Sequence, residues 1–142
     1  PGALERGQHR AQLLLPYERG MELEGLAHER AESLLEQYEA LPAARTCLCH
    51  SDLHRHNVLW SAAEGCLLDW EYAHVGDPFW DLAGWACTNA LSPASRAEFM
   101  YAYLGREPQP AEEERLALLM RLYETICEFW AALAAAQPPR AP

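Results

Sequence analysis

One short stretch of the chain, residues 50–57, gathers the side chains that could do chemistry. It reads His-Ser-Asp-Leu-His-Arg-His-Asn, and an Asp-Trp-Glu triplet begins twelve residues after Asn57, at Asp69. A carboxylate such as Asp52 can orient or deprotonate an attacking hydroxyl, and the oxygens of Asn57 and Asp69 are of the kind that Mg2+ binds in proteins. Together they indicate a site for phosphoryl transfer.

Short apolar runs are expected to position these side chains. Thr46 to Cys49 is predicted to be a strand that leads into the loop, and residues 57–60 and 66–69 are predicted to pair as a hairpin. Asp52 and Asn57 would then lie at opposite ends of one loop and face a common centre. Asp69 would end a buried strand, a common position for a functional group.

The same residues resemble the aminoglycoside phosphotransferase and choline kinase family, a group related to protein kinases. Members carry His-Gly-Asp or His-Asn-Asp, then Asn, then Asp-Phe or Asp-Trp. A second block at residues 77–83, Asp-Pro-Phe-Trp-Asp-Leu-Ala, is similar to the family's Asp-Pro-x-x-Asp-Leu-Ala segment. The Asp-Trp-Glu-Tyr-Ala run at 69–73 is more similar to the choline, ethanolamine and thiamine kinase branch than to the antibiotic-modifying branch. The match covers roughly residues 47–86.

The resemblance implies a fold and a role for each matched residue. The fold would be α+β and mostly helical: the C-terminal lobe of a protein-kinase-like fold, with a small β-hairpin carrying the catalytic loop. Asp52 would be the catalytic base or would orient the hydroxyl, and Asn57 and Asp69 would hold Mg2+ beside ATP. His50 would support the loop, and Asp81 would brace it through hydrogen bonds without touching the substrate.

Two positions depart from the family pattern. Ser51 stands where Gly or Asn is usual, and Arg55-His56 stands where many members have Pro-Gly. A Gly site often requires positive φ, which His adopts only at some cost. We therefore expect strain at His56, with some loss of activity.

A larger departure precedes the motifs. Family members hold the nucleotide partly with an N-terminal lobe of antiparallel strands that carries a phosphate-covering loop and a Lys. Only about fifty residues precede His50, they contain no lysine, and they have the pattern of a helix. The chain also begins at Pro1 rather than Met. We therefore expect a C-terminal lobe that works with an N-terminal lobe of the same protein and is inactive without it.

Aromatic and acidic side chains would suit a cationic substrate, because ring faces and carboxylates both attract cations. Choline, ethanolamine, thiamine and aminoglycosides are substrates of this kind, and a choline-type kinase would need such a pocket. The candidates are Trp70, Glu71, Trp85, Tyr123, Glu124 and Trp130. Aromatic residues at helical spacing are more often part of a core than of a ligand cage, so a packing role stays open for each of them.

Helices are expected on both sides of the motifs. One is predicted over residues 21–41, ended by Pro42, and another over 79–90. A third would start at an N-cap Ser92, with Pro93 at its first helical position, and end near Gly105. The last helix would have Glu112 to Glu114 in its first turn. Its apolar positions are Leu116, Leu119, Met120, Tyr123, Ile126, Cys127, Trp130 and Leu133.

Composition limits the partners. The chain has 142 residues, half of them hydrophobic, which is enough for one compact domain over 1–137 with a disordered tail at 138–142. Its net charge of -10 argues against a nucleic acid or an anionic membrane surface as the main ligand and is compatible with a cationic substrate, although acidic surfaces also serve solubility. No apolar run is long enough to span a bilayer. Five cysteines without disulfide-framework spacing indicate reduced thiols in a cytoplasmic protein.

Three other interpretations of the motif region are weighed against the kinase. Cys47, Cys49, His50, His54 and His56 place five potential zinc ligands within ten residues, but the usual Cys-x2-Cys pair is missing. A serine hydrolase is excluded because there is no Gly-x-Ser-x-Gly elbow. The serious rival is a noncatalytic kinase-like binding module, or a C-lobe fragment that is inactive by itself.

Overall fold

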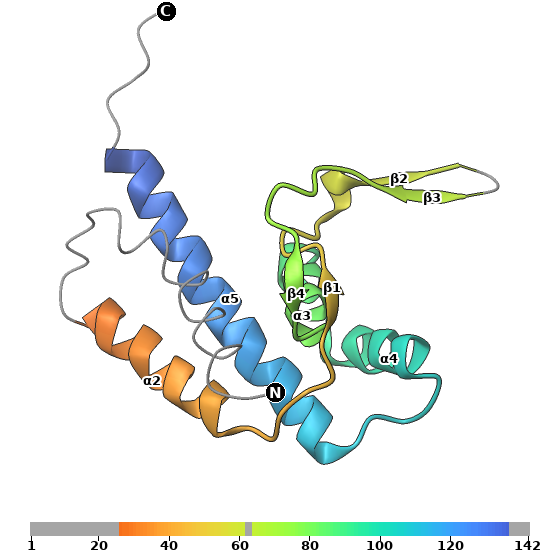
Figure 1. Ribbon diagram of the computed structural model, residues 1–142, viewed down its shortest axis with the longest axis horizontal. Helices are drawn as coiled ribbons and strands as arrows, with labels where there is room; N and C mark the ends of the chain where they lie inside the picture. The colour runs from red at the N-terminus through yellow and green to blue at the C-terminus, as the bar shows by residue number, and fades with distance from the viewer. Residues whose placement is uncertain (1–25, 62–63, 137–142) are drawn as a thin grey trace, which may run out of the picture. The chain divides into compact units, whose positions relative to one another are not determined.

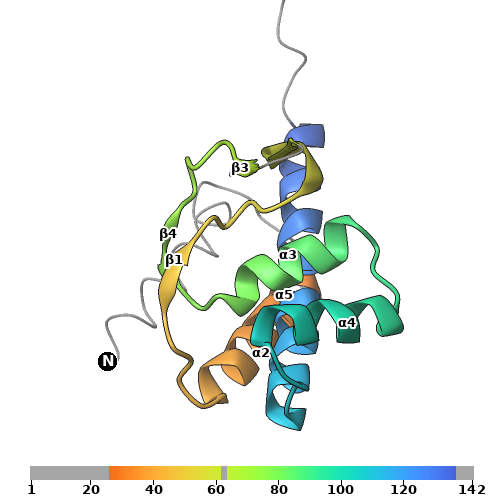
Figure 2. The same ribbon diagram turned by 90° about the vertical axis from the view of Figure 1, so that its right-hand side faces the viewer.

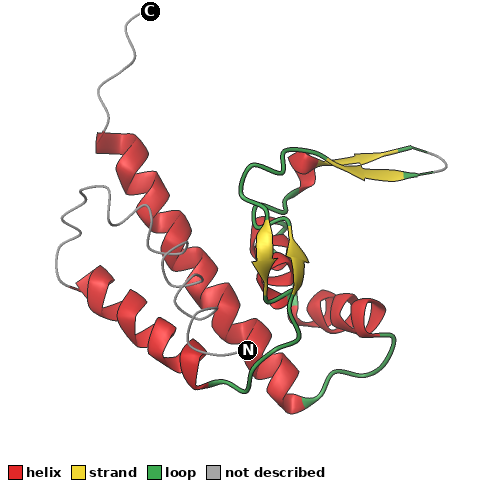
Figure 3. Cartoon of the chain, in the orientation of Figure 1, coloured by secondary structure: helices red, strands yellow, loops and turns green. Residues whose placement is uncertain are grey.

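The structure is a computed structural model that describes residues 26–61 and 64–136 (Figure 1). The elements are, in order, α2 (Leu26–Ala40), β1 (Cys47–Cys49), the 3-10 turn η1 (Arg55–Asn57), β2 (Val58–Trp60), β3 (Gly65–Leu67), β4 (His74–Gly76), α3 (Phe79–Thr88), α4 (Pro93–Leu104) and α5 (Pro110–Ala136). The described part contains four α-helices and two small antiparallel sheets. Figure 3 draws the helices in red and the strands in yellow. The predicted mostly helical α+β class is confirmed.

The chain divides into two compact units. Among the described residues, one unit contains α2 and the part of α5 from Arg121 onward, and the other runs from Leu41 to Met120. The motif residues all belong to the second unit. No described helix combines the length and the apolar character that crossing a membrane requires.

Two strand pairs flank the loop that carries the motif. β1 pairs with β4, with Leu48 opposite Val75, and β2 pairs with β3, with Trp60 opposite Gly65. Figure 2 shows β1 and β4 side by side. The predicted strand and hairpin are confirmed, but Asn57 and Asp69 lie just outside the hairpin strands rather than within them.

The core of the second unit forms around α3. Asp77 starts this helix, because its carboxylate accepts the backbone N–H of Phe79 at 2.9 Å and its carbonyl accepts that of Trp80 at 3.0 Å. The helix ends at Thr88, two residues earlier than predicted, since Ala90 adopts a left-handed φ of 48°. The buried apolar residues of this unit include Phe79, Trp80, Leu82, Ala83, Ala86, Met100, Leu116 and Leu119.

Helix α4 has the ends that its sequence predicts. The side chain of Ser92 accepts the backbone N–H of Ser95 at 3.1 Å, and Pro93 occupies the first turn. Gly105 follows the last turn with a φ of 68° and donates its N–H to the carbonyl of Tyr101 at 2.8 Å. Both predicted boundaries are confirmed.

A buried ion pair next to the start of α3 was not predicted. The guanidinium of Arg115 on α5 contacts the carboxylate of Asp77 and donates to the carbonyl of Pro42. Arg115 is 8% exposed and Asp77 is 2% exposed. One cation thus joins three parts of the second unit that are far apart in sequence: the segment after α2, the start of α3 and the start of α5.

Helices α2 and α5 differ from the prediction, α2 in its end and α5 in which side chains are buried. α2 ends at Ala40, and the predicted residues 21–25 lie outside the described part of the chain. Along α5, Leu116, Leu119 and Tyr123 are buried as predicted, but Cys127 and Trp130 are exposed. The further buried residues on this helix are Leu118, Leu122, Thr125 and Phe129. The side chain of Leu133 and the tail at 138–142 are outside the described residues.

Candidate active site

The loop begins with its backbone fixed to the first turn of α3. Asp81 accepts the N–H of His50 at 2.7 Å through one carboxylate oxygen and the N–H of Ser51 at 2.7 Å through the other. The indole N–H of Trp80 donates to the carbonyl of Ser51 at 3.3 Å. Hydrogen bonds to a carboxylate are stronger than neutral ones, so Asp81 holds this turn firmly.

Ser51 has the left-handed backbone conformation in this loop. Its φ is 69°, and its hydroxyl lies 2.9 Å from Nδ1 of His74 on β4. The strain expected at His56 is absent, because His56 lies within η1 and is not among the described residues with positive φ. That expectation was wrong. The position that requires an unusual φ is the other departure from the family pattern, where Gly or Asn is usual.

His50 connects the turn to the segment that precedes Asp69. Its ring is buried, Nε2 lies 2.7 Å from the carbonyl oxygen of Leu68, and Nδ1 accepts the backbone N–H of Asp52 at 3.3 Å. The ring also packs against Trp70, with the centroids 4.9 Å apart. One imidazole therefore contacts the backbone next to both acidic residues, Asp52 and Asp69.

Asp52 and Asn57 are in direct contact across the loop. The amide N–H group of Asn57 donates to the backbone carbonyl of Asp52 at 3.0 Å and to its carboxylate Oδ2 at 3.3 Å. Asn57 is 8% exposed, whereas Asp52 is half-buried. Because the amide nitrogen is directed at Asp52, the amide oxygen is the atom left to bind a ligand. The predicted proximity of these two residues is present in the structure.

Asp69 lies at the base of the hairpin. The N–H of Leu68 donates to the carbonyl of Asn57 at 2.9 Å, which brings the residue before Asp69 against the residue before β2. Asp69 itself has a φ of 60° and is exposed. The prediction that it ends a buried strand was wrong: all three residues of β3 are exposed. An apolar run indicates a strand but does not reveal which partner covers it.

The acidic side chains create a negative environment at Tyr72, which the sequence analysis did not single out. Burial raises the pKa of Tyr72, and the negative charges of Glu71, Asp52 and Asp69 raise it further. Tyr72 is 51% exposed. Carboxylates from the loop and from the turn after β3 are thus close enough to act on one phenol, in a region that solvent can enter.

The predicted substrate residues divide between the two units. Trp70 and Glu71 are exposed in the turn after Asp69, and the indole N–H of Trp70 donates to the carbonyl of Leu67 at 3.0 Å. Trp85 is half-buried on α3. The other three are on the part of α5 that belongs to the first unit: Tyr123 is buried, and Glu124 and Trp130 are exposed. A shared substrate pocket remains a prediction.

The donor atoms favour a hard metal ion over zinc. Within the described ranges, no three His, Cys, Asp or Glu side chains gather in a way that could hold a metal. Burial, followed by the nearby Asp81 and Cys47, raises the pKa of the Cys49 thiol. The zinc alternative is not supported. An amide oxygen from Asn57 and a carboxylate from Asp69 suit Mg2+, which usually takes one or two carboxylates and fills its other positions with water and phosphate oxygens.

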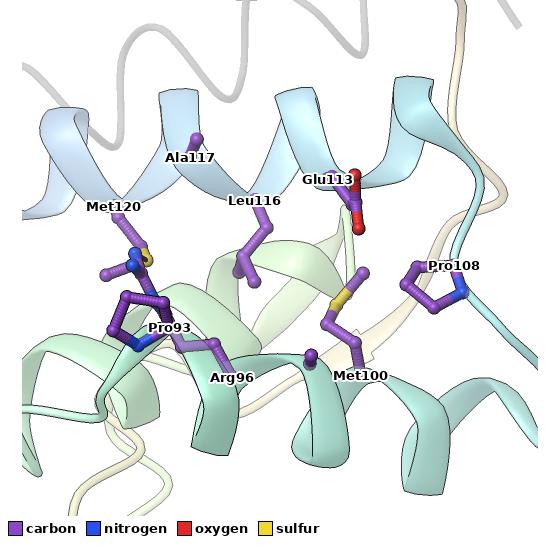
Figure 4. Close-up of a pocket in the computed structure, with 9 residues that line it drawn as sticks. Pro93, Arg96, Met100, Pro108, Glu113, Leu116, Ala117 and Met120 are labelled. Carbon is purple, nitrogen blue, oxygen red and sulfur yellow. Dashed lines mark hydrogen bonds between the residues drawn. The ribbon is translucent and has the colours of Figure 1, made fainter.

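One pocket is separate from this region. It lies between α4 and the start of α5 (Figure 4) and is lined mainly by apolar side chains, including Met100, Leu116 and Met120. Arg96 and Glu113 are its two charged residues, and Arg96 donates to the sulfur of Met120 at 3.5 Å. None of the predicted site residues lines it.

The fold is that of kinase-like proteins. The chain matches a choline/ethanolamine kinase family protein from Mesorhizobium loti with a TM-score of 0.76 and 23% identity, over 94% of this chain and 47% of that chain. It matches choline kinase LicA from Streptococcus pneumoniae with a TM-score of 0.66 and 20% identity, over 95% of this chain and 48% of that chain. A structure of LicA in complex with AMP gives a TM-score of 0.65 at 20% identity, over 94% and 46%. The predicted kinase-like fold is confirmed.

The sequence gives the family. The profile of the Phosphotransferase enzyme family matches residues 3–119, so the chain belongs to that family. Viomycin phosphotransferase from Streptomyces vinaceus is 40% identical over 60 residues, which are 39% of this chain and 21% of that protein. The chain spans about a fifth of this relative and about half of the structural relatives.

Proposed function

We propose that this chain is the catalytic lobe of a kinase that uses ATP and Mg2+ to phosphorylate a hydroxyl group on a small cationic molecule. The observation that carries the proposal is the contact between Asp52 and Asn57 at the base of a hairpin that also presents Asp69. A hydroxyl acceptor needs a carboxylate to take or orient its proton, and nucleotide phosphates need a cation held beside that carboxylate. Family membership supports the same chemistry.

The residues around the site have distinct roles in this proposal. Asp52 accepts the proton of the substrate hydroxyl or orients it for attack. Asn57 and Asp69 would hold Mg2+, which supplies charge neutralisation to the phosphates when it is bound. His50 and Asp81 fix the backbone on which Asp52 stands, through the contacts to Leu68 and to the N–H groups of the turn.

A cationic substrate fits the surroundings of the site. Trp70 and Tyr72 are exposed aromatic residues on either side of the exposed Glu71, directly after Asp69. Rings and carboxylates in one accessible turn attract ammonium groups. Relatives named as a choline kinase and a viomycin phosphotransferase support an amino alcohol or an aminoglycoside as the substrate class. Trp85, half-buried on α3, belongs to the same unit and is included in the proposed contact set.

The nucleotide requires a second lobe in this proposal. The chain corresponds to about half of each structural relative, one of which was solved with AMP. We place ATP between this lobe and a nucleotide-binding lobe of the same protein, so the 142-residue chain by itself would be inactive. Five cysteines without a disulfide framework are consistent with a cytoplasmic location, where ATP is available.

Turnover of Mg-ATP tests the proposal. The natural full-length protein would be assayed for ADP release with choline, ethanolamine, thiamine, an aminoglycoside and a neutral sugar. We expect turnover with a cationic acceptor, and a fall in kcat of about 100-fold to 10,000-fold in Asp52→Asn, with an unchanged melting temperature. Glu98→Gln, at an exposed position on α4, is the matched control and should retain full activity.

The opposite result has a clear meaning. Folded protein with neither turnover nor nucleotide binding would favour a noncatalytic kinase-like binding module. Wild-type turnover in Asp52→Asn would still be consistent with a kinase but would show that Asp52 has no catalytic role.

A further inference from the structure

His54 faces the carboxylate of Asp52 across the loop. Its Nε2 atom lies 3.5 Å from Oδ2 of Asp52, and the two side chains are 27% and 36% exposed. The sequence analysis considered His54 only as a potential zinc ligand. Its position beside the proposed catalytic carboxylate indicates a different use.

The backbone of the loop fixes which nitrogen of His54 carries the proton. Nδ1 accepts the backbone N–H of His56 at 3.2 Å, and this contact caps the start of η1. A nitrogen that accepts an N–H cannot itself be protonated, so the neutral ring carries its proton on Nε2. The protonated nitrogen is therefore the one that faces Asp52.

Two side-chain nitrogens approach the same carboxylate oxygen of Asp52. Nδ2 of Asn57 donates to Oδ2 at 3.3 Å, and Nε2 of His54 approaches Oδ2 at 3.5 Å. Among the described residues, none donates a hydrogen bond to Oδ1. Because Asn57 donates to Oδ2 and His54 lies next to it, Oδ1 is the oxygen available to a substrate hydroxyl.

We propose that His54 is a positioning residue that, together with Asn57, holds Oδ2 of Asp52 and thereby presents Oδ1 to the hydroxyl that is phosphorylated. The inference rests on the proposed function, because it assigns the orientation of the same carboxylate. The separation of 3.5 Å is longer than a strong hydrogen bond, and catalytic contacts commonly shorten once the substrate is bound. A ring already fixed by its own backbone loses little rotational freedom in making this contact.

The alternative is that His54 only caps η1. Two substitutions separate the roles. His54→Asn retains a good N-cap side chain, but it is too short to reach Asp52. His54→Gln carries an N–H donor at about the reach of the imidazole. The exposed Glu98 on α4 provides the control, Glu98→Gln.

Steady-state kinetics of the natural full-length protein give the first test. We expect His54→Asn to lower kcat by about 10- to 100-fold while KM for Mg-ATP changes by less than about twofold, as for other residues that orient a reacting group. His54→Gln should recover most of the lost kcat, and Glu98→Gln should match the wild type. A wild-type kcat in His54→Asn, or a His54→Gln variant as impaired as His54→Asn, would overturn the assignment.

Nitrogen NMR of the chain gives a second test that needs no activity. At neutral pH the His54 ring should show a proton on Nε2 and a bare Nδ1; a proton on Nδ1 would contradict the proposal. The two levels of inference also fail differently. If Asp52→Asn is inactive and His54→Asn is fully active, only the proposed role of His54 is disproved. If Asp52→Asn is fully active, the proposed role of the Asp52 carboxylate is disproved as well.

Discussion

The loop at residues 50–57 and the β2–β3 hairpin are adjacent in sequence but are held by different interactions. In the loop, His50 is 1% exposed and Asn57 is 8% exposed, and polar contacts connect the loop to α3 and to the segment before Asp69. In the hairpin, Leu59 is 55% exposed and Trp60 is 79% exposed. Polar side chains are thus buried while apolar ones are in solvent, the reverse of the usual distribution.

This difference shows where the site obtains its geometry. A buried polar group costs free energy unless it is hydrogen-bonded, so each contact in the loop admits few alternative arrangements. The hairpin strands are held mainly by their own ladder, with a further hydrogen bond from the indole of Trp70 to the carbonyl of Leu67. Asn57 and Asp69 lie where the two regions meet, at the pairing between Leu68 and Asn57. Substitutions in the loop and its supports should therefore cost much more than substitutions near the hairpin tip.

The largest effect is expected at the buried ion pair between Arg115 and Asp77. Arg115→Ala would remove the guanidinium that contacts the buried carboxylate of Asp77 and donates to the carbonyl of Pro42. Breaking a buried pair on one side typically costs about 3–5 kcal/mol in the free energy of unfolding. Urea denaturation of the chain measures this loss. Arg121→Ala, at an exposed position on the same helix, should change stability by less than about 0.5 kcal/mol; equal losses in both variants would contradict the prediction.

The next largest effect is expected at Asp81, which holds the start of the loop. Asp81→Ala removes the acceptor of two backbone N–H groups, those of His50 and Ser51. We expect a loss of about 3 kcal/mol in unfolding free energy, because partly buried donors would be left without a partner. Asp81→Asn keeps one acceptor oxygen and should lose less. A stability for Asp81→Ala within error of the wild type would show that water replaces the carboxylate without cost.

A pair of substitutions at Ser51 isolates the backbone strain. Ser51→Gly and Ser51→Val both lose the hydroxyl that contacts His74, so their difference reports the left-handed φ of 69°. A β-branched residue is poorly tolerated there, and Val should be less stable than Gly by about 2 kcal/mol. Comparison of their urea midpoints checks this. Equal stability would mean that the turn changes conformation in the variants.

An exposed ion pair shows how much the burial of the loop contacts matters. Arg106 donates to both carboxylate oxygens of Glu112 at 2.8 Å and 2.7 Å, and the N–H of Gln109 donates to Glu112 at the start of α5. The bond from Arg106, followed by that from Gln109, lowers the pKa of Glu112 to about 2. Because the pair is exposed and screened, we expect Glu112→Gln to lose at most about 1 kcal/mol at neutral pH.

The pH dependence of this pair has a defined direction. A depressed pKa means that the stabilisation is complete above the ordinary value of 4.5 and is lost as the pH falls toward about 2. The difference in unfolding free energy between the wild type and Glu112→Gln should therefore shrink across that interval. A difference that stays constant from pH 6 to pH 2 would show that the charge of Glu112 is not its source.

Local sequence signals predicted the elements better than the contacts between them. Ser92, Pro93 and Gly105 act through neighbours a few residues away, and the structure has the helix boundaries that they indicate. The β1 strand and the hairpin followed from short apolar runs between turn residues. Such signals act on the backbone within a few residues, so they can be recognised from the local sequence alone.

The long-range contacts and the exposure of surfaces could not be predicted in this way. Arg115 meets Asp77 and Pro42 across 38 and 73 positions, and nothing local marks that arginine as buried. The prediction of which face of α5 is buried was only partly correct. Apolar residues such as Leu118, Leu122 and Trp130 lie around much of the helix, and periodicity alone does not show which of them are buried. The spacing of Asp52, Asn57 and Asp69 led to their predicted roles, whereas the approach of His54 to Asp52 is visible only in the structure.

The smallest effect is expected near the hairpin tip. Trp60 is 79% exposed and lies over Gly65 on the facing strand, where an added Cβ would come within 3.0 Å of its ring. Because little of the indole is buried, Trp60→Ser should change the unfolding free energy by less than about 0.5 kcal/mol, and Leu59→Thr should do the same. A loss as large as that of Asp81→Ala would mean that the hairpin is covered in solution. Sedimentation velocity at increasing concentration would then show whether a second copy of the chain provides the cover, because self-association through exposed apolar residues rises with concentration.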